Sequence, residues 1–328
     1  MGLRYGQQGL RPLHPVRDLG AVADLLERVF SRELDANGRQ MIREARMMSR
    51  IGPFIYLLAP LSGGGAGFSP GYVWEEDGRI VGNVTMIRSG KRPGFWQVAN
   101  VAVDHDHRRQ GIASRMMEES IEYIRRHNGR AISLQVRQDN KAVGLYHRLN
   151  FQSMGAVTRW QLNGRLCLDQ ILSHGRMVIQ ARRGDWAQIW ELSRSVSLAA
   201  QGWPEPQSES DFHPSFWRWL SDLVSTRLVK RWVAPSVLGD ELDGYVEVRV
   251  YSGAIPQITL RVRPKLADQL EGDLLKAALC LLADRGYYRA AADHPAGDVP
   301  AEGRFREAGF RPQRTLLLMH LDLAGGTV

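Results

Sequence analysis

The strongest constraint on this fold is an apolar strand that runs through a short basic turn directly into an amphipathic helix. Residues 101–113 read VAVDHDHRRQGIA, and apolar residues then recur at helical spacing at Met116, Met117, Ile121 and Ile124. The first N–H groups of a helix lack intrahelical acceptors, and the helix dipole adds partial positive charge there. The segment therefore predicts an anion site, for pyrophosphate above all.

The residue types in this turn suit a phosphate. Gly111 and Ala113 let an anion approach the backbone closely, and Arg108 and Arg109 add positive charge. Taken by itself, the turn also fits a basic surface connection between a strand and a helix. Neither Gly-x-x-x-x-Gly-Lys-Ser/Thr nor Gly-x-Gly-x-x-Gly occurs near it, which argues against nucleoside triphosphate hydrolysis and nicotinamide binding.

A second element follows the helix. A predicted strand at 131–136 leads to Asn140, then to a short helix that contains Tyr146 and ends in Asn150-Phe151. The whole stretch resembles the GNAT superfamily of acyl-coenzyme A-dependent N-acyltransferases, whose signature Gln/Arg-x-x-Gly-x-Gly/Ala is matched by residues 108–113. Asn150 replaces the superfamily's glycine, and asparagine also tolerates the left-handed conformation.

The resemblance implies a site for acetyl-coenzyme A where the fourth and fifth strands splay apart. Tyr146 would protonate the departing thiolate, although it also fits a plain core tyrosine. The resemblance implies no metal. The implied coenzyme contacts are the pantetheine-pairing strand residues Val101, Ala102 and Val103, the pyrophosphate-binding residues Arg108, Arg109, Gln110, Gly111, Ile112, Ala113 and Ser114, and Asn140 beside the pantetheine.

The general base is not evident from the sequence. Some relatives, such as the ribosomal-protein alanine acetyltransferases, carry a glutamate on the fifth strand, where this chain has Gln135. An amide cannot accept a proton at neutral pH. Glu75 and Glu76 lie near a strand end and are candidates, but they also fit a solvated hairpin.

Composition limits the class of partner. The net charge of +8 favours an anionic partner, which the coenzyme satisfies, and the dispersed basic residues carry no nucleic-acid motif. Two cysteines, Cys167 and Cys280, exclude a disulfide framework, show no metal-ligand spacing and fit a reducing cytoplasm. The start lacks the apolar core of a signal peptide, and the apolar run 53–61 is too short to span a membrane. We expect no membrane association, and the sequence is compatible with an oligomer.

The second half repeats the first. A length of 328 residues suggests two domains, and strands at 177–181 and 257–262 with helices from 186 and 270 echo the first half. We predict an α/β (α+β) fold of two GNAT-like domains, each a mixed, mostly antiparallel sheet flanked by helices. The predicted boundaries are 1–162 for the coenzyme-binding domain, 163–176 for the linker and 177–328 for the second domain. The layout resembles tandem GNAT proteins such as the mycothiol synthases.

The chemistry is not repeated. An aspartate in the second turn would repel pyrophosphate and a leucine would crowd it, so we predict a degenerate C-terminal half. The alignment behind this prediction places Gly286 on Gly129, Asp268 on Gly111, Lys265 on Arg108, Leu270 on Ala113, and Phe305 close to Tyr146.

The function expected from these features is transfer of an acetyl group from acetyl-coenzyme A to a primary amine by direct attack in a ternary complex. The acceptor, a small molecule or a peptide, is not set by the fold. A glycine-rich loop at 61–67 is a candidate gate for it, and the aromatic stretch 203–219 fits either a pocket wall or core packing. The alternative function is a non-catalytic coenzyme-binding, sensing or scaffolding module.

Overall fold

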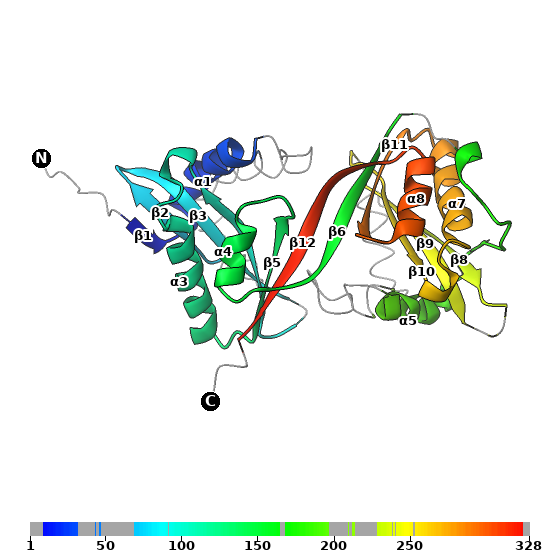
Figure 1. Ribbon diagram of the computed structural model, residues 1–328, viewed down its shortest axis with the longest axis horizontal. Helices are drawn as coiled ribbons and strands as arrows, with labels where there is room; N and C mark the ends of the chain where they lie inside the picture. The colour runs from blue at the N-terminus through cyan, green and yellow to red at the C-terminus, as the bar shows by residue number, and fades with distance from the viewer. Residues whose placement is uncertain are drawn as a thin grey trace, which may run out of the picture. The chain divides into compact units, whose positions relative to one another are not determined.

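A computed structural model describes residues 9–31, 43, 46, 69–90, 92–164, 168–196, 209, 212–213, 228–237, 239, 241–251 and 253–323. These residues form two compact units (Figure 1). Unit 1 consists of the described residues of Met1–Leu134, Gly144–Gln152 and His320–Val328, and unit 2 of those of Gln135–Val143 and Ser153–Met319. The domain boundaries expected from the sequence stay predictions.

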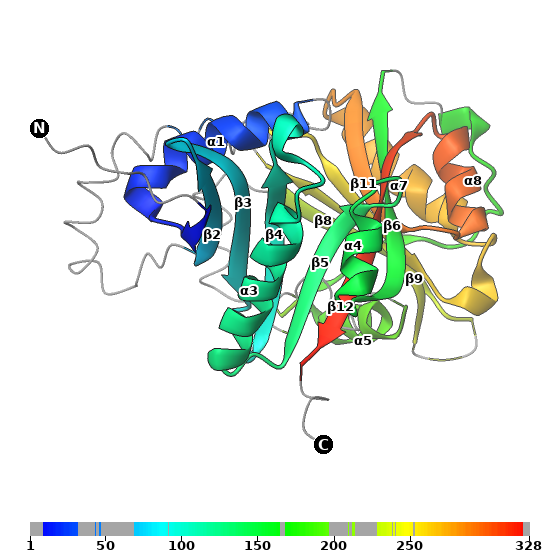
Figure 2. The same cartoon turned by 60° about the vertical axis from the view of Figure 1, so that its left-hand side comes forward.

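Unit 1 is built on the strand order β1-β2-β3-β4-β5 (Figure 2). Neighbouring strands are antiparallel except β4 and β5, which are parallel. The elements are β1 (Gly9–Pro12), α1 (Pro15–Phe30), β2 (Gly71–Glu76), β3 (Arg79–Arg88), β4 (Phe95–Val103), α3 (Ile112–Arg126), the start of β5 (Ala131–Arg137) and most of α4 (Val143–Arg148).

Helices cover both faces of this sheet because its strands alternate two sets of apolar residues. Val73 packs in one cluster with Leu25 of α1. The next residue, Trp74, lies on the other face, where the side chains of α3 come within van der Waals distance of Gly82. A Cβ on Gly82 would lie 2.9 Å from Trp74 Cβ and 3.1 Å from Ile112 Cγ2, so α3 is held close to the strands.

Unit 2 has the strand order β12-β6-β11-β10-β9-β8-β7. Here β10 and β11 pair in parallel, whereas β11–β6, β10–β9, β9–β8 and β8–β7 pair antiparallel. The elements are β6 (Gln152–Asn163), β7 (Ile179–Gln180), α5 (Trp186–Val196), β8 (Leu228–Pro235), β9 (Leu242–Val250), β10 (Gln257–Val262), α7 (Glu271–Asp284), β11 (Arg289–Pro295), α8 (Val299–Glu307) and β12 (Arg311–Asp322).

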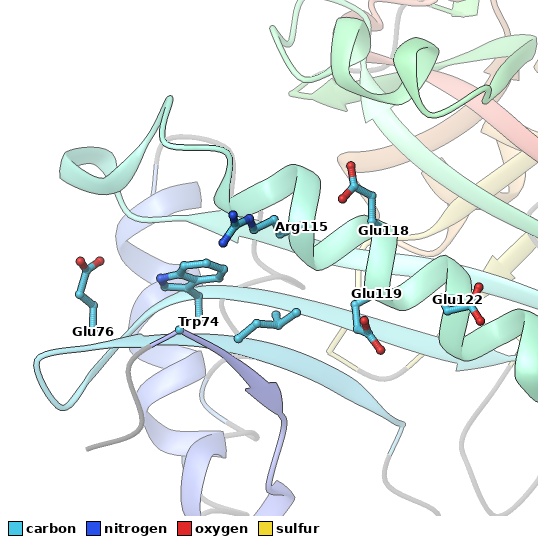
Figure 3. A pocket seen from close by; sticks show the side chains of 8 residues that line it. Trp74, Glu76, Arg115, Glu118, Glu119 and Glu122 are labelled. Carbon is cyan, nitrogen blue, oxygen red and sulfur yellow. The ribbon is translucent and has the colours of Figure 1, made fainter. Parts of the chain in front are cut away.

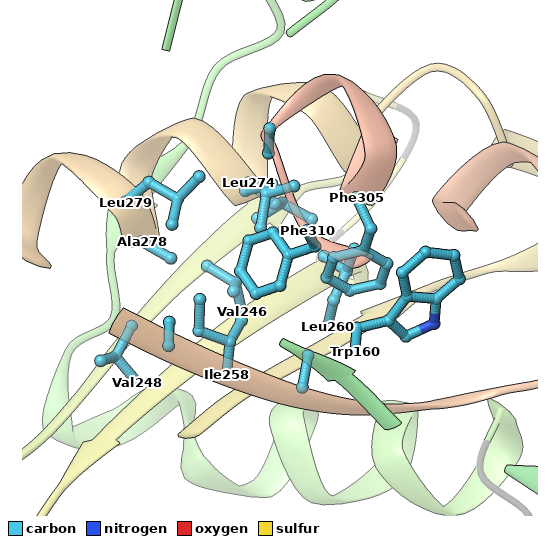
Figure 4. Close-up of a cluster of buried hydrophobic side chains, with 14 of the residues drawn as sticks. Trp160, Val246, Val248, Ile258, Leu260, Leu274, Ala278, Leu279, Phe305 and Phe310 are labelled. Carbon is cyan, nitrogen blue, oxygen red and sulfur yellow. The ribbon is translucent and has the colours of Figure 1, made fainter. Parts of the chain in front are cut away.

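The core of unit 2 lies under α7 and α8 (Figure 4). Val246 and Val248 of β9 point into it, together with Phe305 and Phe310. The intervening Tyr245 belongs to a separate cluster on the other face, with Ile189 and Leu192 of α5. Both faces of β9 are therefore buried.

The fold class predicted from the sequence is confirmed: a mixed, mostly antiparallel sheet is flanked by helices. One strand is shorter than expected: β7 covers only Ile179–Gln180. β11 runs from Arg289 to Pro295, and it begins there because Tyr287 N still donates to Leu282 O at the end of α7 (2.8 Å). The glycine-rich loop 61–67 and nearly all of 203–219 lie outside the described residues. Among the described helices, none combines the length and apolar content needed to cross a bilayer.

Candidate functional site

The basic turn enters α3 with two residues in the left-handed region. After the 3₁₀ turn His105–His107, Arg109 has φ +64° and Gly111 has φ +79°. Arg115 N donates to Gly111 O at 3.1 Å, which is the first hydrogen bond of the helix. The N–H groups of Ile112, Ala113 and Ser114 therefore have no acceptor within the helix and are available to an anion.

The turn is open where an anion would bind. Gly111 is exposed, and a Cβ placed on it would meet no atom within 4 Å. The Ile112 side chain points away into the core, where it is 3% exposed. Arg109 is exposed, and Arg108 Nε donates to Val103 O at 3.1 Å, which holds that side chain over the turn. These features fit a pyrophosphate held by main-chain N–H groups with arginines at the rim.

The two parallel strands before the turn separate, as the resemblance implies. Their pairing runs from Phe95 opposite Ala131 to Val98 opposite Leu134, and β4 continues to Val103. Ala102 is buried on the face covered by α1, whereas Val101 and Val103 are half-buried. The end of β4 thus extends past its described pairing with β5.

Sequence reasoning missed a pair of asparagines at the point of separation. The register of β3 and β4 shifts between Asn83 and Thr85, and Asn100 on β4 has φ +54°. Asn83 is fully buried, and its Nδ2 donates to Asn100 O at 2.9 Å. Asparagine is unfavourable in strands, and one in each of two neighbouring strands is the signal that could have revealed this bulge.

Tyr146 is buried in unit 1. Its side chain is 5% exposed and meets Phe151 edge to face, with ring centroids 6.0 Å apart. Burial raises the pKa of Tyr146 to about 12. The hydroxyl is consequently fully protonated at neutral pH, which suits a proton donor and excludes a tyrosinate.

Asn140 and Gln135 belong to unit 2 and are described within it. Asn140 Oδ1 accepts a hydrogen bond from Ala142 N at 2.9 Å, and Asn140 O accepts one from Val143 N at 3.1 Å. The residue therefore opens α4, as its position in the sequence predicts. Gln135 is exposed between the buried Leu134 and Val136.

One candidate base is already engaged. Arg11 Nε donates to Glu75 Oε2 at 2.6 Å, and Arg11 Nη1 donates to the buried Asp18 at 2.6 Å. Glu76 Oε2 lies 3.7 Å from His107 Nε2, beside the turn. The paired Glu75 is thus poorly suited to accept a proton from a substrate amine, which leaves Glu76 as the less engaged carboxylate of the two.

A pocket of about 750 Å³ lies between α3 and the strands β1 and β2. Figure 3 shows the Trp74 side chain beside Arg115, with glutamates further along α3. Arg126 Nη2 donates a hydrogen bond to Glu119 Oε1 at 2.8 Å. Of the sequence-predicted candidates, Glu76 lines this pocket and the predicted coenzyme-binding residues and Tyr146 do not; the walls are Gly9, Leu10, Trp74, Glu76, Arg115, Glu118, Glu119 and Glu122.

Unit 2 contains a second turn with a similar backbone, and the alignment predicted from the sequence is wrong by two residues. The 3₁₀ turn Pro264–Leu266 is followed by Asp268 at φ +70° and by α7 from Glu271. Asp268 therefore corresponds to Arg109, not to Gly111. The remaining correspondences, all at a constant interval of 159 residues, are Leu270 to Gly111, Glu271 to Ile112 and Gly272 to Ala113.

The error has a structural cause. α7 has 14 residues and α3 has 15, so an alignment anchored at the helix ends shifts the helix starts. The prediction also aligned the wrong residue with Gly286 at the helix end. The left-handed residue after α3 is Asn128 (φ +57°), and this residue, not Gly129, matches Gly286 (φ +71°). Gly129, used in the prediction, is not in the left-handed region.

The predicted correspondence of Phe305 with Tyr146 agrees with the geometry. Phe305 meets Phe310 at 5.4 Å and 67°, and Tyr146 meets Phe151 at 6.0 Å and 66°. In each pair the second residue donates its N–H to the carbonyl of the first, at 2.9 and 3.0 Å. Unit 2 thus presents a phenyl ring at the position of the unit 1 phenol.

Metal ligands do not gather in the part of the chain that the structure describes: no three His, Cys, Asp or Glu residues there form a group able to hold a metal ion. The turn before α3 instead offers backbone N–H groups.

Comparison with known proteins agrees with this geometry. Residues 51–151 match the model of the acetyltransferase (GNAT) family. A GCN5-related N-acetyltransferase from Sphaerobacter thermophilus is similar in structure, with a TM-score of 0.64, 15% identity and coverage of 97% of this chain and 96% of that one. A tandem GNAT protein from the clavulanic acid biosynthesis pathway has a TM-score of 0.56 at 15% identity, covering 97% and 99%. No curated protein matches the sequence. Residues 51–151 therefore match the GNAT family model, and the chain has the fold of these GNAT structures over nearly its whole length.

Proposed function

We propose that this chain is an N-acyltransferase that transfers an acetyl group from acetyl-coenzyme A to a primary amine, with the coenzyme bound in unit 1. The observation that carries the proposal is the open turn before α3, where Gly111 at φ +79° leaves backbone N–H groups accessible. A match to the GNAT family over the same residues supports it. The acceptor remains a small molecule or a peptide with a free amine.

The proposed residues of unit 1 bind two parts of the coenzyme. N–H groups from Arg109 to Ser114, with the Arg108 side chain, would hold the pyrophosphate. The strand end at Val101–Val103 would bind the pantetheine arm. When bound, acetyl-coenzyme A supplies the acetyl group as a thioester.

Proton transfer completes the proposed reaction. The amine nitrogen attacks the thioester carbonyl carbon, the carbon–sulfur bond breaks, and Tyr146 gives its proton to the leaving sulfur. A thiol titrates near ~8.5, so a tyrosine of pKa about 12 would protonate a free thiolate at a cost of roughly 5 kcal/mol. We therefore propose that this proton moves while the bond breaks, when the sulfur is still partly bonded. The amine's own proton leaves to water.

Unit 2 has a supporting part in this proposal. Phe305 has no hydroxyl to donate, and Leu270 replaces the left-handed glycine of the first turn. We propose that unit 2 is a degenerate GNAT-like domain and that chemistry takes place only in unit 1.

A pair of glycine variants tests the proposed coenzyme site. Gly111→Asp places a carboxylate where the pyrophosphate would bind and should abolish acetyl-coenzyme A binding in calorimetry. Gly78→Asp is the matched control, because Gly78 (φ +75°) is another left-handed glycine with no atom within 4 Å of its missing Cβ. Unchanged affinity in Gly111→Asp, or equal loss in both variants, would refute the assignment.

A non-catalytic role in coenzyme binding or sensing is the second candidate. The observation that favours it is the pairing of Glu75 with Arg11, together with an amide at Gln135. Neither Glu75 nor Gln135 can therefore act as a strong base toward the amine. Binding of acetyl-coenzyme A without release of free thiol across a broad panel of amines would support this role over catalysis.

A further inference from the structure

The anion-binding position of the second turn is filled by a side chain of the same turn. Glu271, the first residue of α7, is 2% exposed, and its Oε2 accepts a hydrogen bond from Leu270 N at 3.3 Å. Burial raises the pKa of Glu271, while backbone hydrogen bonds from Glu271, Asp268 and Leu270 act to lower it. The carboxylate thus lies among the N–H groups that open the helix.

These N–H groups are the counterparts of those assigned to pyrophosphate in unit 1. Asp268, Leu270 and Glu271 correspond to Arg109, Gly111 and Ile112 at the interval of 159 residues. The two turns differ in the N-cap backbone, which is left-handed at Gly111 (φ +79°) but not at Leu270 (φ −117°), and in the first helical residue. The Ile112 side chain enters the core and leaves the N–H groups open, whereas the Glu271 side chain turns back onto them.

A backbone segment also covers the second turn. Leu172 O lies so close to Gly272 that a Cβ there would be 1.8 Å from it, and Gly272 is buried. The segment is held at both ends of this contact: Leu172 N donates to Glu307 Oε2 at 2.9 Å, and Ser173 Oγ donates to Asp273. In the turn of unit 1, a Cβ placed on Gly111, two residues before the counterpart of Gly272, would meet no atom within 4 Å.

We propose that Glu271 is the resident anion of the second turn and that, with the segment 171–174 above it, it excludes a coenzyme pyrophosphate from unit 2. Each chain then binds one coenzyme, in unit 1, because the second turn is both filled by Glu271 and covered by the segment 171–174. The stoichiometry rests on the proposed function of unit 1; the role of Glu271 does not.

The role of Glu271 is tested by anion rescue in the full chain. The Gly111→Asp background removes the first turn as a competing site, and Glu271→Ala empties the second. Orthophosphate should then raise the unfolding temperature of the double variant by about 3 °C or more, with saturation, because it occupies the vacated N–H groups. It should not stabilise Gly111→Asp alone in this way.

The matched control is Asp284→Ala in the same background, because Asp284 is an exposed carboxylate at the other end of α7. An equal phosphate response in the Glu271 and Asp284 variants would overturn the role of Glu271. Should the Glu271→Ala protein not fold, Glu271→Ile introduces the residue of the first turn and carries the same test.

The stoichiometry is measured by native mass spectrometry of the wild-type chain with coenzyme A. One coenzyme per chain, lost in Gly111→Asp, is the expected result. Two per chain, or one that survives Gly111→Asp, would overturn the exclusion from unit 2. Binding of none would refute the proposed function of unit 1, and the phosphate experiment would still decide the role of Glu271.

Discussion

Arg109 and Asp268 adopt the same left-handed backbone, at φ +64° and +70°, each three residues before the start of a helix. The two turns share this left-handed residue but differ in backbone at the N-cap, where Gly111 has φ +79° and Leu270 has φ −117°. A glycine, an isoleucine and an arginine in unit 1 stand where unit 2 has Leu270, Glu271 and Asp268. We propose that these substitutions set the different anion preferences of the two turns.

Tyr146→Phe should lower the turnover number by about 10²–10⁴ and leave the dissociation constant of acetyl-coenzyme A nearly unchanged. The phenyl ring preserves the contact with Phe151 but has no proton to give to the sulfur. Steady-state kinetics with calorimetry measure both quantities. Tyr123→Phe on α3 is the control, and turnover equal to wild type in the Tyr146 variant would remove this residue from the mechanism.

Arg11→Ala should destabilise the protein by about 3 kcal/mol, because the carboxylate of Asp18, buried at 2% exposure, loses its buried ionic partner and keeps only the exposed Arg17. Chemical denaturation measures the loss. Arg194→Ala, which breaks an exposed pair with Glu191, should leave the denaturation midpoint almost unchanged. Equal effects of the two substitutions would show that the buried position of Arg11 is unimportant.

The same pair predicts a pH dependence. Burial acts to raise the pKa of Asp18, but hydrogen bonds from Arg11, His14 N and Arg17 outweigh it and lower the pKa below 3.8. A carboxyl with a lowered folded pKa stabilises the protein above its unfolded pKa, and this contribution is lost as pH falls below about 3.8. In Asp18→Asn, the free energy of unfolding should fall less steeply as the pH is lowered below about 3.8. An unchanged steepness would contradict the role given to Asp18.

His294 should make unit 2 less stable in mild acid. Burial lowers the pKa of His294 below 6.5, although its hydrogen bond to Asp298 (2.7 Å) acts to raise it. The unfolded chain then binds more protons than the folded one below about pH 6.5, so stability is complete above that pH and declines beneath it. Unfolding midpoints between pH 5 and 8 measure the slope.

His294→Phe should remove the decline of the unfolding midpoint below about pH 6.5, because the variant has no group to protonate at this position. His105→Gln is the control, since His105 is exposed. A pH dependence that persists unchanged in His294→Phe would assign the acid sensitivity to other groups.

Gly272→Ala and Gly303→Ala should change stability in opposite directions. A methyl group on Gly272 would collide with Leu172 O, and we expect a loss of about 1–3 kcal/mol. Gly303 lies in α8 with no atom within 4 Å of its missing Cβ, so alanine there should add about 0.5–1 kcal/mol. Denaturant midpoints compare them, and a Gly272→Ala protein as stable as wild type would mean that Leu172 does not rest on this turn.

Local sequence determined the elements that carry their own signals. The periodicity of Met116, Ile121 and Ile124 was sufficient to predict α3, because a helix that packs on a sheet must repeat its apolar residues at 3.6-residue spacing. The turn at Asp77-Gly78 and the strand β10 were predictable for similar reasons. The residue types at adjacent positions are sufficient to indicate a hairpin turn or an alternating strand.

Tertiary structure decided what depends on distant residues. The register between the two repeats was wrong from sequence because one helix is a residue shorter, and only the backbone angles of Arg109 and Asp268 restored it. The ion pair of Arg11 with Glu75 joins residues 64 positions apart, and Leu172 reaches Gly272 across 100. No local pattern encodes such contacts, because burial and hydrogen bonding between remote segments arise only when the chain has packed. Whether a turn is open to an anion or already filled is a property of that packing.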